Sequence, residues 1–322
     1  MKEILVTFPV KEKHKKLLES SGRNLHFTYT TAAEASKKEV IETADIILGN
    51  VSADALKEAK KLKFLQLNSA GANEYVIPGV LPDGVKLCNA TGAYGKSIAE
   101  HMLAAAFTLL KKMNHYEDNR LQHLWKDEGN VGTIFGSTTL ILGMGDIGSE
   151  FAMRMHALGS HVIAVRRNKS EKPDYIDALY QMDALEELLP QADIVACSLP
   201  GTDATYHLLN TSRLKLMKNS AILINVGRGT LIPTEDLIDA LKNGTIAAAA
   251  IDVAEAEPLP ADSPLWDVPN LLITPHVAGN FHTRHIWDTI VEIAAENLKA
   301  YLNEQPLRNE VDFETGYRKY FK

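Results

Sequence analysis

The sequence predicts an α/β protein built from two doubly wound parallel sheets. Short apolar runs alternate with amphipathic helical stretches along the chain, the pattern of parallel strands covered by helices. The 322 residues exceed what one hydrophobic core usually organises, so we expect two domains. A glycine-rich segment, 143–148, separates an apolar run from a helical one, as at the first turn of a doubly wound sheet.

The first series of elements occupies the N-terminal part of the chain. Strands are predicted at 4–8, 27–29, 46–48 and 64–67, with a helix near 11–20, and the series ends near Asn89. A long helix is then expected from Ser97 to about Trp125, because Ser97 and Glu100 have the spacing of a capping box. A helix of this length can tie two domains together.

The second series begins at the strand before the glycine segment. It comprises six predicted strands, at 138–142, 161–165, 194–198, 221–225, 247–252 and 271–274. Another long amphipathic helix, 283–302, has the length to return to the first domain. The expected domains are therefore 1–97 together with 289–322, and 98–288 between them.

Composition excludes several classes of partner. The net charge is −7, and the lysine clusters at 11–16 and 57–63 sit among leucines at helical spacing, which is typical of solvated helix faces. We therefore expect neither a nucleic acid nor a membrane partner. No apolar run approaches the roughly 20 residues that span a bilayer, and no signal-peptide pattern precedes the first strand.

The chain contains two cysteines, Cys88 and Cys197, each within an apolar, strand-like run. This placement predicts two buried, reduced thiols rather than a disulfide or a nucleophile. No neighbouring residues offer metal-ligand spacing, so no metal is expected. These features together predict a cytoplasmic protein.

The glycine segment reads Gly143-Met144-Gly145-Asp146-Ile147-Gly148 and matches G-x-G-x-x-G between a strand and a helix. Gly143 would allow the tight turn, Gly145 would let the backbone approach a pyrophosphate, and Gly148 would let helix and strand pack closely. A glycine-rich turn that binds nothing is the alternative. We interpret all six residues as part of a dinucleotide site.

The end of the next strand, 161–165, indicates which dinucleotide is preferred. An acidic residue there would bind the ribose hydroxyls of NAD, but the sequence continues Arg166-Arg167-Asn168-Lys169. Guanidinium groups at this point would bind the 2′-phosphate of NADP through charge-assisted hydrogen bonds. The alternative is an exposed basic turn. Arg166 and Arg167 therefore predict a preference for NADP(H), with NAD possible.

Three further motifs each follow a predicted strand, so their side chains can converge at one sheet edge. They carry Arg228 in Gly227-Arg228-Gly229, Glu257 before Pro258-Leu259, and His276 in Thr274-Pro275-His276. An arginine can bind a carboxylate and polarise the neighbouring ketone, and a histidine can donate a proton near neutral pH. A carboxylate beside that histidine would fix its tautomer and stabilise the imidazolium. Each residue alone could be structural; together they predict hydride transfer between a nicotinamide and C2 of a small 2-oxo or 2-hydroxy acid.

In this order, the motifs resemble the D-isomer-specific 2-hydroxy acid dehydrogenase family over essentially the whole chain. The resemblance implies that Arg228 binds substrate and that His276, paired with Glu257, is the acid/base. It also implies that Asp252 binds the nicotinamide carboxamide and that the stretch 193–200, with Pro200 at its end, flanks the cofactor. The loop 67–72 resembles the family's substrate loop, whose backbone amides bind the carboxylate.

In that substrate loop, Ala70 and Gly71 are the binding candidates. The resemblance further implies a Rossmann cofactor domain inserted into a flavodoxin-like substrate domain, and a homodimer built largely by the cofactor domains. Two departures stand out. Arg166 replaces an aspartate common in the family, which favours NADP, and Asn73 replaces another, to which we attach no consequence.

The tail 309–317 resembles the glyoxylate/hydroxypyruvate-reductase-like branch, which predicts a reductase of that type. One alternative is an NAD-dependent phosphoglycerate dehydrogenase, which would need basic residues near the substrate loop, and 69–73 supplies none. The other is a dinucleotide-sensing binding protein, since transcriptional corepressors share this fold. Such a protein could keep the glycine turn and lose the acid/base pair.

Overall fold

The computed structural model describes residues 1–167, 171–279, 283–316 and 318–319. Asn168 and Lys169 of the predicted basic turn, and residue 317 of the tail, lie outside the described residues. The chain forms two compact units, Met1–Tyr94 with Phe281–Lys322, and Gly95–Asn280. The predicted domain limits after residues 97 and 288 fall slightly further along the chain, inside helices α5 (Gly95–Leu110) and α11 (Arg284–Leu302).

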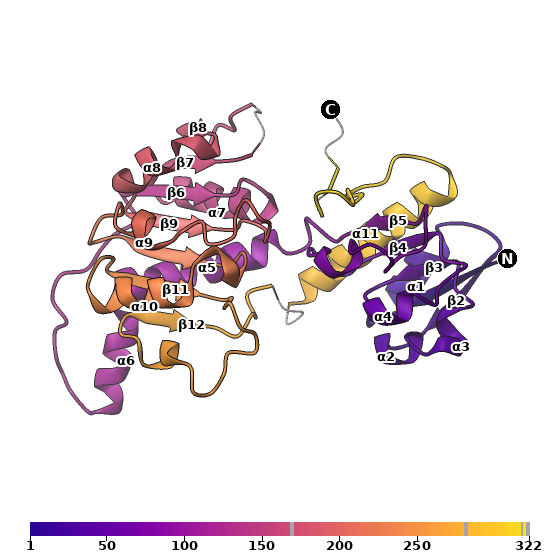
Figure 1. Ribbon diagram of the computed structural model, residues 1–322, viewed down its shortest axis with the longest axis horizontal. Helices are drawn as coiled ribbons and strands as arrows, with labels where there is room; N and C mark the ends of the chain where they lie inside the picture. Colours follow the sequence, from indigo (N-terminus) through magenta and orange to yellow (C-terminus); the bar gives the residue numbers. More distant parts are fainter. Residues whose placement is uncertain (168–170, 280–282, 317, 320–322) are drawn as a thin grey trace. The chain divides into compact units, whose positions relative to one another are not determined.

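The first unit contains a five-stranded parallel sheet with the order β2-β1-β3-β4-β5. This order is the flavodoxin-like one, so the predicted fold class of this domain is confirmed. The strands are β1 (Lys2–Val6), β2 (Leu25–Tyr29), β3 (Ile46–Leu48), β4 (Phe64–Gln66) and β5 (Lys86–Cys88). Short helices α2 (Ala32–Ala35), α3 (Lys38–Ile41) and α4 (Ala53–Leu56) lie together in this unit (Figure 1).

The C-terminal helix completes the first unit. Helix α11 packs on α1 (Glu12–Glu19) and on β4. Asn297 of α11 is fully buried, and its Nδ2 donates to Oε1 of the buried Gln66 at 2.7 Å. Because a buried amide without a partner is costly, this bond fixes the helix on the sheet. The predicted return helix 283–302 is confirmed, with Thr283 as the residue before its first turn.

The second unit contains a seven-stranded parallel sheet with the order β12-β11-β10-β9-β6-β7-β8, which is the Rossmann order with one further strand. The strands are β6 (Thr138–Leu142), β7 (His161–Val165), β8 (Ala178–Tyr180), β9 (Ile194–Cys197), β10 (Ile222–Asn225), β11 (Ala248–Ile251) and β12 (Leu271–Ile273). The prediction of six strands missed β8, because this edge strand has three residues and none is buried.

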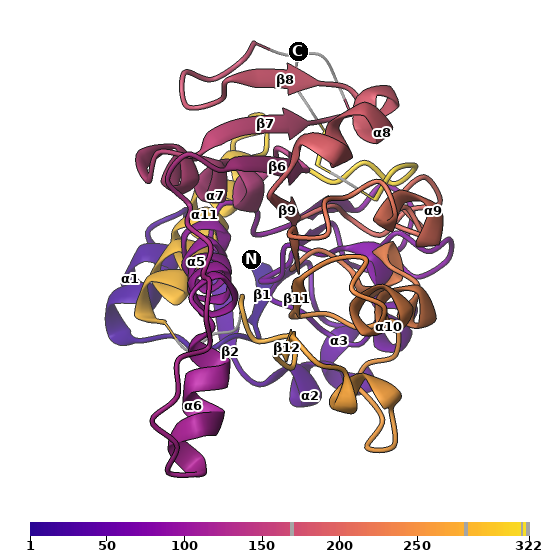
Figure 2. The same cartoon turned by 90° about the vertical axis from the view of Figure 1, so that its left-hand side faces the viewer.

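Helices cover both faces of the second sheet. Helices α5 and α7 (Asp146–Ala157) lie on one side, and α8 (Leu185–Leu188), α9 (Thr211–Leu214) and α10 (Thr234–Lys242) lie on the other (Figure 2). The apolar side chains of this second group pack against Leu140, Val195, Leu223 and Ala249 of the strands.

The single long helix predicted from Ser97 to about Trp125 is wrong in two respects. The structure has α5 followed by α6 (Met113–Leu121), because Lys112 adopts a left-handed conformation with φ of 54° that interrupts the helix. The capping box at Ser97 is also wrong, since α5 already begins at Gly95. The Gly95 N–H donates to Oδ2 of Asp146 at 3.0 Å, so a carboxylate distant in sequence caps this helix.

Both cysteines are buried free thiols, as predicted, and burial raises the pKa of each. A thiol that resists ionisation is a poor nucleophile. Among the described residues, no helix is both long enough and apolar enough to cross a membrane.

Candidate active site

The glycine turn joins β6 to α7. Its backbone is closely packed at Gly148 and accessible at Gly145. Gly143 has a φ of +103°, and a Cβ on Gly148 would lie 1.9 Å from the carbonyl oxygen of Gly143. A Cβ on Gly145 would meet nothing within 4 Å, so the backbone there is accessible to a ligand. Because the N–H groups at the start of α7 have no partners within the helix, the turn fits an anionic pyrophosphate.

Contacts outside the turn hold it in place. Ser198, just after β9, donates from Oγ to the Gly143 carbonyl at 3.0 Å. The Asp146 carboxylate faces the start of α5, and Met144 and Ile147 are half-buried. Of the six predicted residues, the three glycines therefore shape the turn, while Asp146 connects it to α5.

Arg166 and Arg167 follow β7 at the carboxyl edge of the sheet. The Arg166 N–H donates to the carbonyl of Tyr180 at 3.1 Å, and the Arg167 carbonyl accepts from Nε2 of Gln181 at 3.2 Å. Strand β8 and the residue after it thus hold the backbone of this basic pair. The guanidinium of an arginine placed here can bind a phosphate with two parallel hydrogen bonds.

Pro200 lies in the loop that follows β9. Its carbonyl accepts a hydrogen bond of 2.5 Å from Oγ1 of Thr205, which folds the loop back on itself. A Cβ on Gly201 would lie 3.2 Å from Cγ of Arg228, so this loop packs against the arginine.

Arg228 follows β10, and its two neighbouring glycines are required by close backbone packing. A Cβ on Gly227 would lie 2.4 Å from the carbonyl oxygen of Leu199, and one on Gly229 would lie 1.9 Å from the carbonyl carbon of Ala254. No other residue fits these positions without moving the backbone. The glycines therefore bring the arginine turn against the loops that follow β9 and β11. Arg228 itself is half-buried, with Nη1 donating to the Gly227 carbonyl at 2.7 Å.

His276 and Glu257 form a direct pair. His276 Nδ1 lies 2.6 Å from Oε2 of Glu257, and Oε1 of Glu257 accepts from the Ala254 N–H at 3.0 Å. Because a carboxylate accepts, the imidazole carries a proton on Nδ1, and Nε2 is the nitrogen that can exchange a proton with a substrate. The His276 side chain is 54% exposed, so this nitrogen is accessible in the second unit.

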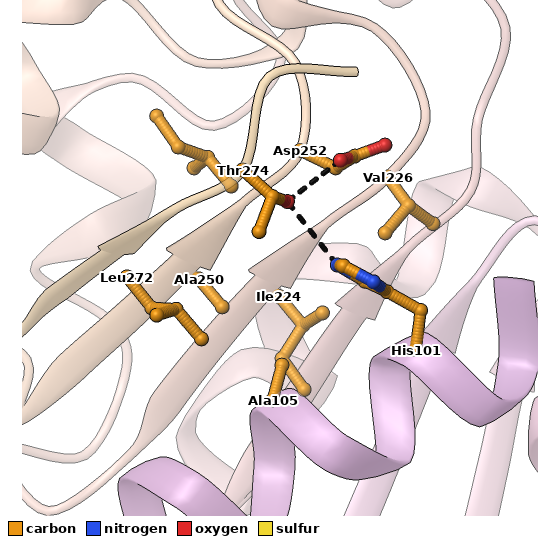
Figure 3. Close-up of a pocket in the computed structure, with 9 residues that line it drawn as sticks. His101, Ala105, Ile224, Val226, Ala250, Asp252, Leu272 and Thr274 are labelled. Atoms are coloured by element: carbon orange, nitrogen blue, oxygen red, sulfur yellow. Dashed lines mark hydrogen bonds between the residues drawn. The ribbon is translucent and has the colours of Figure 1, made fainter. Parts of the chain in front are cut away.

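Asp252 follows β11 and is buried, with its carboxylate next to the Thr274 hydroxyl (Figure 3). Its Oδ1 accepts from Thr274 Oγ1 at 2.6 Å and from the Val277 N–H at 2.9 Å, and its Oδ2 accepts from the Ala278 N–H at 3.0 Å. His101 of α5 lies 3.2 Å from the Thr274 hydroxyl. A carboxylate offers about four acceptor positions, so three of them serve the fold.

A small pocket lies between α5 and the neighbouring ends of three strands. It is lined by His101, Ala105, Ile224, Val226, Ala250, Ile251, Asp252, Leu272 and Thr274 (Figure 3). Sequence reasoning missed His101 and Thr274 as members of this site. Thr274 is the first residue of the predicted histidine motif but was given no role there, whereas His101 gave no signal on a helix far away in sequence.

The predicted substrate loop belongs to the first unit. Asn50 and Asn68 brace it reciprocally, each backbone N–H donating to the side-chain oxygen of the other, at 2.7 and 3.0 Å. Asn89 Nδ2 also donates to the Ala70 carbonyl at 2.8 Å. Within the described part of the chain, no group accepts from the N–H of Ala70 or Gly71. Two such amides can bind a carboxylate.

The second unit thus joins a hydrogen-bonded histidine–glutamate pair, a buried aspartate and a glycine-flanked arginine at the carboxyl edge of one sheet. These are the groups that hydride transfer to a carbonyl requires of a protein: a proton donor and a cation. Among the described residues, no group of three or more potential ligands could hold a metal ion.

Comparisons with known proteins show the family to which this chain is similar. Residues 103–278 match the model of the D-isomer specific 2-hydroxyacid dehydrogenase NAD binding domain. The glyoxylate/hydroxypyruvate reductase B of Pectobacterium atrosepticum is 33% identical over 298 residues, which are 88% of this chain and 91% of the relative.

Two solved structures are also similar. A D-isomer specific 2-hydroxyacid dehydrogenase family protein from Aeromonas salmonicida has a TM-score of 0.85 and 32% identity, covering 97% of this chain and 99% of its own. A D-isomer specific 2-hydroxyacid dehydrogenase from Xanthobacter autotrophicus, solved in complex with NADPH and MES, has a TM-score of 0.83 and 25% identity, covering 98% and 99%.

Proposed function

Since the chain belongs to the D-isomer specific 2-hydroxyacid dehydrogenase family, we propose that it reduces a small 2-oxo acid of the glyoxylate or hydroxypyruvate type with NADPH. The product is the D-2-hydroxy acid. The observation that carries the proposal is the 2.6 Å bond between His276 and Glu257, on a segment packed against the Arg228 turn.

In this reaction the bound nicotinamide supplies a hydride to C2 of the substrate. His276 donates the proton from Nε2 to the carbonyl oxygen, and Glu257 stabilises the imidazolium before transfer. Arg228 binds the substrate carboxylate through its forked donors and polarises the carbonyl. In the first unit, the amides of Ala70 and Gly71 are the groups to which we assign carboxylate binding. In the reverse direction, His276 accepts the proton of the hydroxyl group.

The cofactor role is assigned to residues of the second unit. Gly143–Gly148 and the start of α7 bind the pyrophosphate, and the loop at Pro200 flanks the dinucleotide. Asp252 has one acceptor position left for the nicotinamide carboxamide. Arg166 and Arg167 bind the 2′-phosphate, which makes NADPH preferred over NADH. The Xanthobacter protein was solved in complex with NADPH, which supports the use of this cofactor.

The assembly that fits the surface is a homodimer. We define the α6 arm as residues 113–137; α6 stands away from the sheet of its unit in both views (Figures 1 and 2). It exposes Trp125, Phe135 and Leu121, with relative exposures of 105%, 77% and 65%. Large apolar side chains exposed along one segment favour an interface, and a second copy of the chain is the occupant we propose. The buried reduced thiols suit a reducing compartment such as the cytoplasm.

The two alternative functions require different residues. A phosphoglycerate dehydrogenase needs cations for the substrate phosphate, and residues 69–73 provide none. A dinucleotide sensor needs neither Glu257 nor His276. The deciding experiment follows oxidation of NADPH and of NADH with glyoxylate, hydroxypyruvate, pyruvate and 3-phosphohydroxypyruvate. Turnover of the phosphorylated substrate alone, or no turnover of any, would refute the proposal.

A further inference from the structure

We propose that His101 is a positioning residue for the reaction: through Thr274 and Asp252, it holds the turn that carries His276. The inference rests on the proposed role of His276 and adds to it a residue on a distant helix. Figure 3 shows the chain of contacts, from His101 on α5 through the Thr274 hydroxyl to the Asp252 carboxylate.

The directions of these hydrogen bonds follow from the donors available. A threonine hydroxyl has one proton, and the Asp252 carboxylate can only accept, so at 2.6 Å Thr274 Oγ1 donates to Asp252. The Thr274 oxygen must therefore accept from His101 Nε2, which lies 3.2 Å away. His101 thus carries a proton on Nε2 and fixes the hydroxyl in the orientation that serves Asp252.

Asp252 in turn determines the backbone around His276. Its backbone carbonyl accepts from the His276 N–H at 2.8 Å, and its carboxylate accepts from the next two N–H groups, those of Val277 and Ala278. His276 adopts a φ of +53°, a conformation that L side chains rarely adopt. Such a conformation persists only where surrounding contacts over-determine it, and Asp252 provides those contacts on both sides.

The surroundings make this chain of bonds effective. Asp252 is 4% exposed, and the pocket beside it presents Ala105, Ile224 and Leu272, so few waters compete for its oxygens. The first residue of the same helix, Gly95, is bound to Asp146 of the glycine turn. Helix α5 therefore contacts the cofactor turn at one end and the His276 turn one and a half turns later, which gives it a fixed position from which to orient the histidine.

The test compares variants that remove or keep each donor. His101→Leu and Thr274→Val remove the donors, whereas His101→Gln and Thr274→Ser keep a donor at the corresponding place. His115→Leu is the matched control. His115 lies on the neighbouring helix α6, and its Nε2 makes a similar bond of 2.9 Å to the side chain of Asn270. For each variant, kcat and KM for glyoxylate, Kd for NADPH and the melting temperature are measured.

We expect His101→Leu and Thr274→Val to lower kcat about tenfold, equal to about 1.4 kcal/mol in the barrier. NADPH binding should stay within about twofold, since the glycine turn is untouched and the Asp252 carboxylate keeps its bonds from the Val277 and Ala278 N–H groups. His101→Gln and Thr274→Ser should recover most of kcat. The double variant His101→Leu/Thr274→Val should lose no more than Thr274→Val alone, because both residues act through one chain of bonds.

Equal kcat in His101→Leu and His115→Leu would overturn the positioning role, and so would additive losses in the double variant. If NADPH Kd weakens in parallel with kcat, the chain serves cofactor binding and the proposal is wrong. Failure of the proposed function is a separate result: His276→Ala would then leave turnover intact, whatever the His101 variants do. If His276→Ala abolishes turnover while His101→Leu behaves like the control, only the inference about His101 fails.

Discussion

Alanine substitutions at Gly145 and Gly148 separate cofactor binding from folding within one turn. A methyl group on Gly148 would lie 1.9 Å from the Gly143 carbonyl oxygen. Neither atom can rotate away, because the oxygen belongs to the backbone and the backbone fixes the position of the Cβ. Overpacking usually costs about 1–3 kcal/mol, and we expect Gly148→Ala to reach about 3 kcal/mol or more. The helix propensity of alanine returns only about 1 kcal/mol, which does not offset this loss.

Gly145→Ala should behave in the opposite way. Its methyl group would meet nothing within 4 Å, so we expect a cost in unfolding free energy of at most about 1 kcal/mol, from the preference for glycine over alanine at a helix N-cap. The same methyl group would occupy the space proposed for the pyrophosphate. We therefore expect NADPH Kd to rise at least about tenfold, or about 1.4 kcal/mol.

Urea denaturation gives the unfolding free energy of each variant, and fluorescence titration gives the NADPH Kd. If Gly145→Ala binds NADPH as tightly as the parent, the pyrophosphate does not lie over this backbone. If Gly148→Ala unfolds at the same urea midpoint as the parent, our inference that close packing at Gly148 excludes a methyl group is wrong.

Four further outcomes are expected. Arg166→Asp should shift preference toward NADH by at least about tenfold, since a hydrogen bond to a charged group contributes about 1.5–3 kcal/mol; equal kcat/KM for the two cofactors in the parent would contradict this. His276→Ala should lower kcat for glyoxylate about 10²–10⁴-fold with NADPH Kd nearly unchanged, and a loss under threefold would reassign the proton donor. Arg228→Lys should lower kcat as well as raise KM, because an ammonium cannot make two parallel hydrogen bonds to the substrate carboxylate. If the parent enzyme is as active on acetaldehyde as on glyoxylate, Arg228 does not bind a substrate carboxylate. Hydrogen bonds from Lys13 and His14 lower the pKa of Asp288 from 3.8 to about 2, so its stabilisation is present above pH 3.8 and is lost as the pH falls through about 2; Asp288→Asn should therefore lower the urea midpoint at neutral pH but not in strong acid.

The fold class could be predicted from the sequence because parallel strands buried on both faces form continuous apolar runs. The glycine turn and the arginine, glutamate and histidine motifs could be predicted for a related reason: each lies within six residues of the end of a strand. Strand β8 could not be predicted from the sequence, since its three residues are exposed or half-buried at the sheet edge. The break at Lys112 was missed as well, because no glycine or proline marks it between residues 110 and 114.

By itself, the sequence determined the reaction class, since that depends on residue types that local spacing assigns to strand ends. Only the tertiary structure decided how those residues are held. Asp146 caps a helix that begins 51 residues earlier, and His101 reaches Thr274 across 173 residues. Glycines 227 and 229 are required by backbone atoms of two other loops. Local propensity contains no information on such contacts, because they exist only after the sheet has assembled and brought the distant segments together.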